Sequence, residues 1–188
     1  MAVKPEALYF TEDDDANRLL ADDPFALLVG FALDQQVTVP TAFSGPLKLK
    51  RRLGTLDPRR IAETDPARLE EAFREKPAVH RFPGSMAARV HELAAMVAGE
   101  YGGRAERLWT EARDGDELRR RLAAIPGFGA MKITSLGAVL AKRYDVAKAK
   151  EVAPDHPTLG DVDSPQALLD YQAAKRARKA ELRAKAAQ

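Results

Sequence analysis

The 188-residue chain contains no cysteine, which excludes disulfides, thiolate zinc sites and cysteine-bound iron–sulfur clusters. Aromatic residues make up only 6% of the chain, whereas 45% is apolar, and runs of alanine and leucine predict a mostly helical core. The longest apolar run, residues 25–33, is far shorter than the roughly 20 residues of a membrane span. No signal peptide is recognisable at the start of the chain. We expect a cytoplasmic, monomeric protein with no membrane contact.

The formal net charge is only +2, but acidic and basic residues are unevenly distributed along the chain. Residues 1–40 hold eight acidic and two basic residues, a net charge of −6, so the other 148 residues carry +8. This asymmetry is typical of a protein with one face toward a polyanion, although an ordinary solvated surface also explains it. Residues 175–188 hold six bases and one acid, which suits either a solubility tail or a nonspecific electrostatic arm for DNA.

A tight turn separates two segments, residues 116–125 and 131–144, whose apolar side chains recur at helical spacing. Pro126 should end the first helix, and the glycines of Pro-Gly-Phe-Gly allow a sharp reversal. The amides of Gly127, Gly129 and Ala130 would then point outward at the start of the second helix. Free amides and the helix dipole attract a phosphate there. The pattern predicts either a helix-hairpin-helix grip on a DNA backbone or a plain connector.

Three polar residues, Asp34, Gln35 and Gln36, directly follow the longest apolar run. That run is apolar on nearly all sides, which predicts a helix in the middle of the fold. Periodicity alone favours a simple helix end for the polar residues. The alternative is that Gln35 and Gln36 lie at a ligand-facing edge, where an amide could fill the gap left by a displaced base.

We predict three parts of the chain. Residues 1–23 form an N-terminal segment that packs with the C-terminal part, and residues 24–144 form a helical core. Residues 145–188 form a loop and a C-terminal helix with a basic tail. The histidines His80 and His91 have no second ligand at metal spacing, so we expect no metal site and satisfied histidine side chains.

Four stretches, in this order, resemble the helix-hairpin-helix base-excision DNA glycosylase superfamily, which includes the endonuclease III, adenine-mismatch and 3-methyladenine branches. They are LLVGFALDQQVTV, FPGSMAARVHELAAMVAGEYGG, LAAIPGFGAMKITSLGAVL and EVAPDHPTLGDVD. The resemblance spans roughly residues 24–163. It implies an all-α, two-lobed fold with a cleft between the lobes and the hairpin at residues 122–136. It also implies double-stranded DNA as partner, with neither a metal nor a redox cofactor.

Enzymes of this superfamily flip a damaged nucleotide out of the duplex and cleave its N-glycosidic bond. By the resemblance, the hairpin binds a phosphate beside the lesion, and Gln36, with Gln35 as neighbour, occupies the vacated space. The residues implied to contact DNA are Gly127, Phe128, Gly129, Ala130, Lys132, Gln35 and Gln36.

The catalytic residue implied by the resemblance is Asp155, whose Pro-Asp-His context is similar to the Pro-Asp-Asp of the alkylation-repair branch. Its carboxylate would stabilise positive charge on the deoxyribose and activate water. Asp161 and Asp163 are rivals, and an ordinary loop or N-cap aspartate is the alternative for each. A proline-rich loop follows Asp155, where relatives continue into a helix.

Two departures from the family pattern narrow the expected chemistry. Bifunctional members carry a nucleophilic lysine two residues after the second hairpin glycine, but Met131 stands there, and Lys132 follows about 100° further round the helix. The four-cysteine cluster loop of the endonuclease III branch is also absent. We therefore expect a monofunctional glycosylase for a damaged, for example alkylated, base. The alternatives are a DNA-binding protein that has lost catalysis and a helical interaction module.

Overall fold

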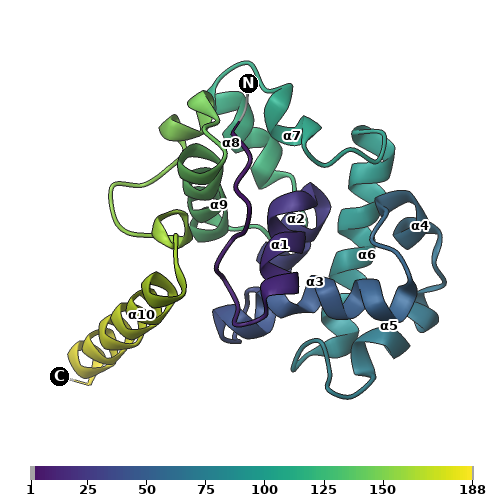
Figure 1. The fold of residues 1–188 in the computed structure, drawn as a ribbon, viewed down its shortest axis with the longest axis horizontal. Coiled ribbons are helices and arrows are strands. Elements are labelled where there is room, and N and C mark those ends of the chain that lie inside the picture. Colours follow the sequence, from purple (N-terminus) through teal and green to yellow (C-terminus); the bar gives the residue numbers. More distant parts are fainter. Residues whose placement is uncertain (1–2, 188) are drawn as a thin grey trace.

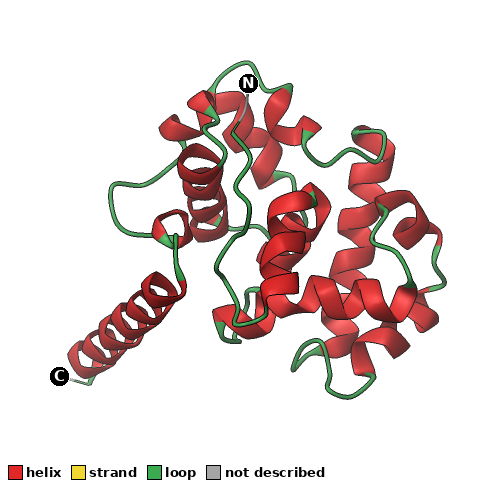
Figure 2. Ribbon diagram, viewed as in Figure 1, coloured by secondary structure: helices red, strands yellow, loops and turns green. Residues whose placement is uncertain are grey.

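The computed structural model describes residues 3–187, and every regular element in this range is a helix (Figures 1 and 2). The predicted all-α fold class is confirmed. In chain order the α-helices are α1 (Asp14–Asp22), α2 (Pro24–Leu33), α3 (Val39–Leu53), α4 (Pro58–Glu63), α5 (Pro66–Arg74), α6 (Pro83–Glu100), α7 (Arg107–Thr110), α8 (Gly115–Ala123), α9 (Ala130–Arg143) and α10 (Pro165–Ala186). Two 3₁₀ helices, η1 (Ala147–Glu151) and η2 (Leu159–Asp161), lie between α9 and α10.

Local capping signals start most of these helices. Asp23, for example, accepts hydrogen bonds from the amides of Phe25 and Ala26, and Pro24 is the first residue of α2. Ser164 caps α10 through the amide of Ala167. A cap of this kind typically contributes about 1 kcal/mol to stability because it satisfies an amide that has no partner within the helix.

Helix α2 forms the centre of the core. All residues from Phe25 to Leu33 are buried, and α2 packs against α1, α3 and α6. From α3, the ring of Phe43 meets Phe31 and Phe10 edge to face, at centroid distances of 5.1 and 4.9 Å. Each large apolar side chain buried in this way contributes about 1.5–3 kcal/mol. The helix therefore ends at a rigid point of the fold, and its C-terminal end positions the polar residues that follow it.

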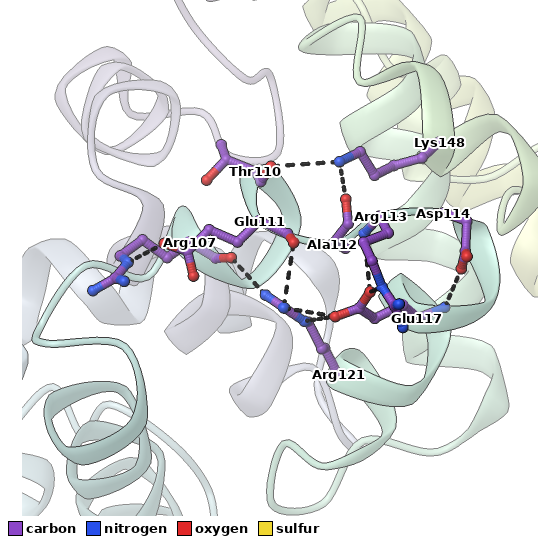
Figure 3. A network of polar contacts seen from close by, with 9 residues as sticks. All are labelled: Arg107, Thr110, Glu111, Ala112, Arg113, Asp114, Glu117, Arg121 and Lys148. Carbon is purple, nitrogen blue, oxygen red and sulfur yellow. Dashed lines mark hydrogen bonds and ion pairs between the residues drawn. The ribbon is translucent and has the colours of Figure 1, made fainter.

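Helix α8, which leads into the hairpin, is tied to α7 by a polar network (Figure 3). The guanidinium of Arg121 donates to the carboxylate of Glu117 at 2.7 Å and to the carbonyls of Arg107 and Glu111 at 3.0 and 3.3 Å. Hydrogen bonds from the side chain and backbone of Arg113, and from the side chain of Arg121, lower the pKa of Glu117 to about 2. The carboxylate is therefore ionised at neutral pH, and α8 is held in place before the turn.

The end of α9 and the η1 helix that follows it contact two earlier parts of the chain, α1 and the end of α7. Lys148 of η1 donates to the carbonyls of Thr110 and Ala112 (Figure 3). The hydroxyl of Tyr144, at the end of α9, donates to two carbonyls in the last turns of α1, at 3.2 and 3.3 Å. Helix α9 also packs closely on η2.

Helix α10 leaves the body of the molecule (Figure 1). Its first turns are anchored by the buried Leu168 and the half-buried Tyr171, whereas residues 173–187 are exposed. None of the helices within residues 3–187 combines the length and apolar character needed to cross a bilayer.

Candidate nucleic-acid interface

The predicted hairpin is present between α8 and α9. Gly127 adopts a φ of +77°, a left-handed conformation that favours glycine. The amide of Phe128 closes the turn by donating to the carbonyl of Ile125 at 3.1 Å. Gly129 is the N-cap of α9, and no side chain caps this helix end. Within the part of the chain that the structure describes, the N–H groups of Gly129 and Ala130 donate no hydrogen bond, so this helix start can accept an anion.

The side chain of Phe128 points into the protein rather than toward solvent. Its ring is only 7% exposed, and the Lys132 ammonium lies 5.7 Å from the ring centroid. The ring of Phe128 is thus buried, and its N–H is engaged in closing the turn. The residue fixes the shape of the turn, and its DNA contact stays a prediction.

The polar residues after α2 form a short loop with two different glutamines. Gln36 is exposed and has a φ of +56°, which is uncommon for a residue other than glycine. Gln35 is half-buried, and its Oε1 accepts a hydrogen bond from Nη1 of Arg89 at 2.6 Å. We call residues 34–38 the wedge loop. Of the two glutamines, only Gln36 is exposed to solvent, which suits its predicted role of filling the space of a flipped nucleotide.

His80 holds the wedge loop to the end of α2. Its Nε2 donates to the carbonyls of Leu33 and Gln35 at 3.0 and 3.1 Å, and its Nδ1 accepts from the amide of Phe82 at 3.0 Å. This arrangement requires a neutral ring that carries its proton on Nε2. Burial lowers the pKa of His80, and the two carbonyl contacts offset only part of that effect. The imidazole of His80 is thus a structural tie, as we expected. For His91 the expectation is wrong, because its Nε2 is buried and has no hydrogen-bond partner among the described residues.

We predict that this tie makes the fold sensitive to acid. Because the pKa of His80 lies below its ordinary value of 6.5, the unfolded chain takes up more protons than the folded chain as the pH falls below 6.5. The free energy of unfolding should therefore decrease on acidification, by at most about 1.4 kcal/mol per pH unit for one proton. Denaturant unfolding between pH 7.5 and about pH 5 measures this slope. His80→Gln should lack this part of the slope, whereas His156→Gln, at an exposed site, should keep it; equal slopes for all three proteins contradict the assignment.

Arg89 of α6 joins the wedge loop to the hairpin. While Nη1 donates to Gln35, the rest of the guanidinium lies against the backbone of Gly127. A Cβ atom on Gly127 would lie 2.6 Å from both Cζ and Nε of Arg89, so glycine is required for this close approach. A second link comes from α9, where Nζ of Lys132 donates to the carbonyl of Ala32 at 3.2 Å. The hairpin and the wedge loop are therefore fixed relative to each other.

A group of charges surrounds the end of α2. Burial raises the pKa of Asp34, and the ammonium groups of Lys175 and Lys132 offset part of that rise. Burial also lowers the pKa of Lys132, with Asp34 opposing the change and Arg89 adding to it. Tyr171 of α10 has a raised pKa, chiefly through burial and also through Asp34. Charged groups of α9 and α10 therefore both influence the Asp34 carboxyl at the end of α2.

A family model described as "HhH-GPD superfamily base excision DNA repair protein" matches residues 29–186, which include the wedge loop, Arg89, the hairpin and most of α10. The chain belongs to the HhH-GPD superfamily. Members of this superfamily are DNA glycosylases of base excision repair, which act on DNA. Searches of the curated proteins and of the solved structures found no match.

Bifunctional HhH-GPD members carry a nucleophilic lysine two residues after the second hairpin glycine. In this chain Met131 occupies that position, and its side chain faces solvent. Met131 is 84% exposed, whereas Lys132, one residue later, is half-buried against the end of α2. Lys132 was expected to be free for a phosphate, but its ammonium is engaged by the carbonyl of Ala32. A phosphate contact by Lys132 stays a prediction, and it would require the ammonium to share or leave that carbonyl.

The three aspartates that the sequence suggests as catalytic residues have different surroundings. Asp161 belongs to η2, where its carboxylate accepts from Thr158 N–H at 2.8 Å and from Lys142 Nζ at 2.5 Å. Burial raises the pKa of Asp161, but these two hydrogen bonds and the charges of Lys142 and Arg143 together lower it further than burial raises it. Asp155 and Asp163 are exposed, and no hydrogen bond or ion pair within residues 3–187 joins Asp155 to the hairpin or the wedge loop.

The sequence did not predict the roles of three residues at this site. Asp34 was noted only as part of a polar helix end, Arg89 only as part of a family-like stretch, and His80 only as isolated. The contacts of Arg89 and His80 span 54 and 47 residues of sequence, so no local pattern indicates them. In the structure, the described residues include no group of three or more metal-ligating side chains.

Proposed function

We propose that this HhH-GPD protein is a monofunctional DNA glycosylase that hydrolyses the N-glycosidic bond of a damaged base, with alkylated bases as the leading class. It would act on a nucleotide flipped out of double-stranded DNA, as a cytoplasmic monomer and without a cofactor. The observation that carries the proposal is the Arg89 bridge, because it fixes a phosphate-binding turn relative to an exposed glutamine.

Each part has a separate task. The N–H groups of Gly129 and Ala130 bind a backbone phosphate beside the damaged nucleotide, while Gln36 fills the space that the nucleotide leaves. The flipped base would lie in a cleft between two helical lobes. Gln36 is exposed and has a left-handed backbone, and His80 holds the loop at its base. Flipping costs a few kcal/mol, which these contacts would supply.

Bond cleavage needs an ionised carboxylate near the deoxyribose. The bond between C1′ and the base nitrogen breaks, and its electron pair leaves with the base. Water supplies the new bond to C1′ and loses a proton, which balances the charge that leaves with the base. A fixed anion stabilises the positive charge that develops on the sugar. Asp155 is the residue that the sequence favours for this role. Asp34 is a second candidate, because it is the one carboxylate within the wedge loop and it interacts electrostatically with Lys132.

The expected absence of lyase chemistry has a structural rationale. A Schiff base requires a free amine, and a methionine at position 131 has none. The amine of Lys132 donates to Ala32 and lies half-buried beside Asp34. Borohydride reduction of the reacting complex is expected to trap no covalent protein–DNA adduct. A trapped adduct that disappears in Lys132→Ala would contradict the monofunctional assignment.

The test is base release under single-turnover conditions from a panel of duplexes, each containing one modified base. The wild-type protein should release at least one base, and Asp155→Asn should release it much more slowly, whereas Asp161→Asn should remain active if it folds. Full activity of Asp155→Asn, with loss in Asp34→Asn, would transfer the catalytic role to Asp34. DNA binding with no release from any duplex would favour a non-catalytic DNA-binding protein. Binding that does not weaken with salt would favour an interaction module.

A further inference from the structure

The exposed part of α10, residues 173–187, is strongly basic, and we call it the basic arm. It contains six basic residues and one acidic residue. None of these bases forms an ion pair with a carboxylate of residues 3–187, although many bases elsewhere in the chain do so. The six are Lys175, Arg176, Arg178, Lys179, Arg183 and Lys185.

The bases share one side of the helix. At 100° per residue they fall within an arc of about 180°, while the opposite side holds alanines and Glu181. This arc is centred on the side that Leu168 and Tyr171 turn toward the body. The basic face therefore continues, beyond the body, the face with which α10 packs on the core.

The spacing of the basic residues argues against an arm whose only role is solubility. Lys175, Lys179 and Arg183 follow one another at i, i+4 intervals, where like charges repel and destabilise a helix. Helices that only need solubility commonly place acids at these spacings, as Glu70 does for Arg74 at 2.6 Å. A polyanion would relieve this repulsion. With few exposed apolar side chains beside the bases, the arm offers charge rather than a hydrophobic face.

We propose that the basic arm binds the phosphate backbone of the DNA duplex that the hairpin holds, in a segment flanking the damaged nucleotide. This inference rests on the proposed function, because it takes the DNA to lie at the wedge loop and hairpin. Among the bases of the arm, Lys175 lies nearest in the helix to Leu168 and Tyr171, which hold α10 on the body, and the other bases lead away from the body. At 1.5 Å per residue the arm is about 22 Å long, which matches about six base pairs of duplex.

The experiment compares two variants that lose the same charge. Lys179→Gln/Arg183→Gln removes one lysine and one arginine from the arm. Lys76→Gln/Arg60→Gln removes the same pair from exposed positions at the end of α5 and in α4, where neither base forms an ion pair within residues 3–187. Binding of an undamaged duplex of about 30 base pairs is followed by fluorescence anisotropy over a range of salt concentrations, because counterion release makes phosphate contacts visible as a slope.

The arm variant should bind at least about tenfold more weakly at 0.1 M salt, and the slope of log K against log salt should fall by about 1.8 for two lost phosphate contacts. The matched variant should stay within about twofold of wild type, and Lys179→Arg/Arg183→Lys should restore binding. If the arm variant binds as the matched variant does while Gly127→Ala binds weakly, the arm proposal is overturned and the proposed function stands. If the wild-type protein binds no duplex at low salt, both are overturned.

Discussion

Replacing Gly127 with alanine is expected to lower the free energy of unfolding by about 1–2 kcal/mol, or about 2–4 °C in Tm for each kcal/mol. The φ of +77° places an alanine Cβ against its own backbone, and the same Cβ meets the Arg89 guanidinium. The guanidinium can move, but it then gives up its position between the hairpin and Gln35. We therefore expect DNA affinity to fall by at least about tenfold, beyond what the loss of stability explains.

Gly129→Ala is the matched control for this effect. Gly129 has a φ of −90°, which any residue adopts, and a Cβ added there would have no neighbour within 4 Å. Alanine at this N-cap should cost less than about 1 kcal/mol and should leave Arg89 in place. Thermal unfolding of both variants makes this comparison of stability. Equal destabilisation by the two substitutions would contradict the strain assigned to Gly127.

The elements that could be predicted from the sequence are those with local signals. The apolar run of α2 between Asp23-Pro24 and a polar end indicates a buried central helix, and all nine of its residues from Phe25 to Leu33 are buried. The turn Pro126–Gly129 between two periodic segments indicates a hairpin in the same way. Helix α6 begins at Pro83, because proline is well suited to the first helical turn.

The sequence could not reveal which side chains meet across the site. The direction of Lys132 depends on how α9 is rotated against α2, and this rotation is set by the packing of Ile133 and Leu136 into the core. The difference between Gln35 and Gln36 depends on the backbone of the wedge loop and on a partner in α6. Asp34 influences the pKa of Tyr171, which is far away in sequence, only because α10 packs on the core. The setting of Asp155 likewise depends on a loop that carries no strong local signal.

Removal of the Arg89 side chain should impair base release strongly while the chain still folds. Arg89→Ala deletes a charged hydrogen bond to Gln35, which costs about 1–2 kcal/mol at a half-buried site. The chain should still fold, because the helix stripe of Met86, Val90 and Leu93 stays intact. Base release should decrease by about 10- to 100-fold, since the wedge loop loses its tie to the hairpin. Arg89→Lys should recover little, because an ammonium cannot both lie flat on Gly127 and donate to Gln35.

A double-mutant cycle tests whether the effects of Gly127 and Arg89 have one cause. In the Arg89→Ala background, the added Cβ of Gly127→Ala no longer meets a guanidinium, and only the strain of the positive φ remains. The second substitution should therefore cost less than it does alone, with a coupling energy of about 0.5–1 kcal/mol in unfolding. The same cycle in duplex binding should show that either substitution removes most of the shared effect. Strict additivity in both measurements would mean that the guanidinium does not couple the turn to the wedge loop, and that these two parts of the interface are held in place independently.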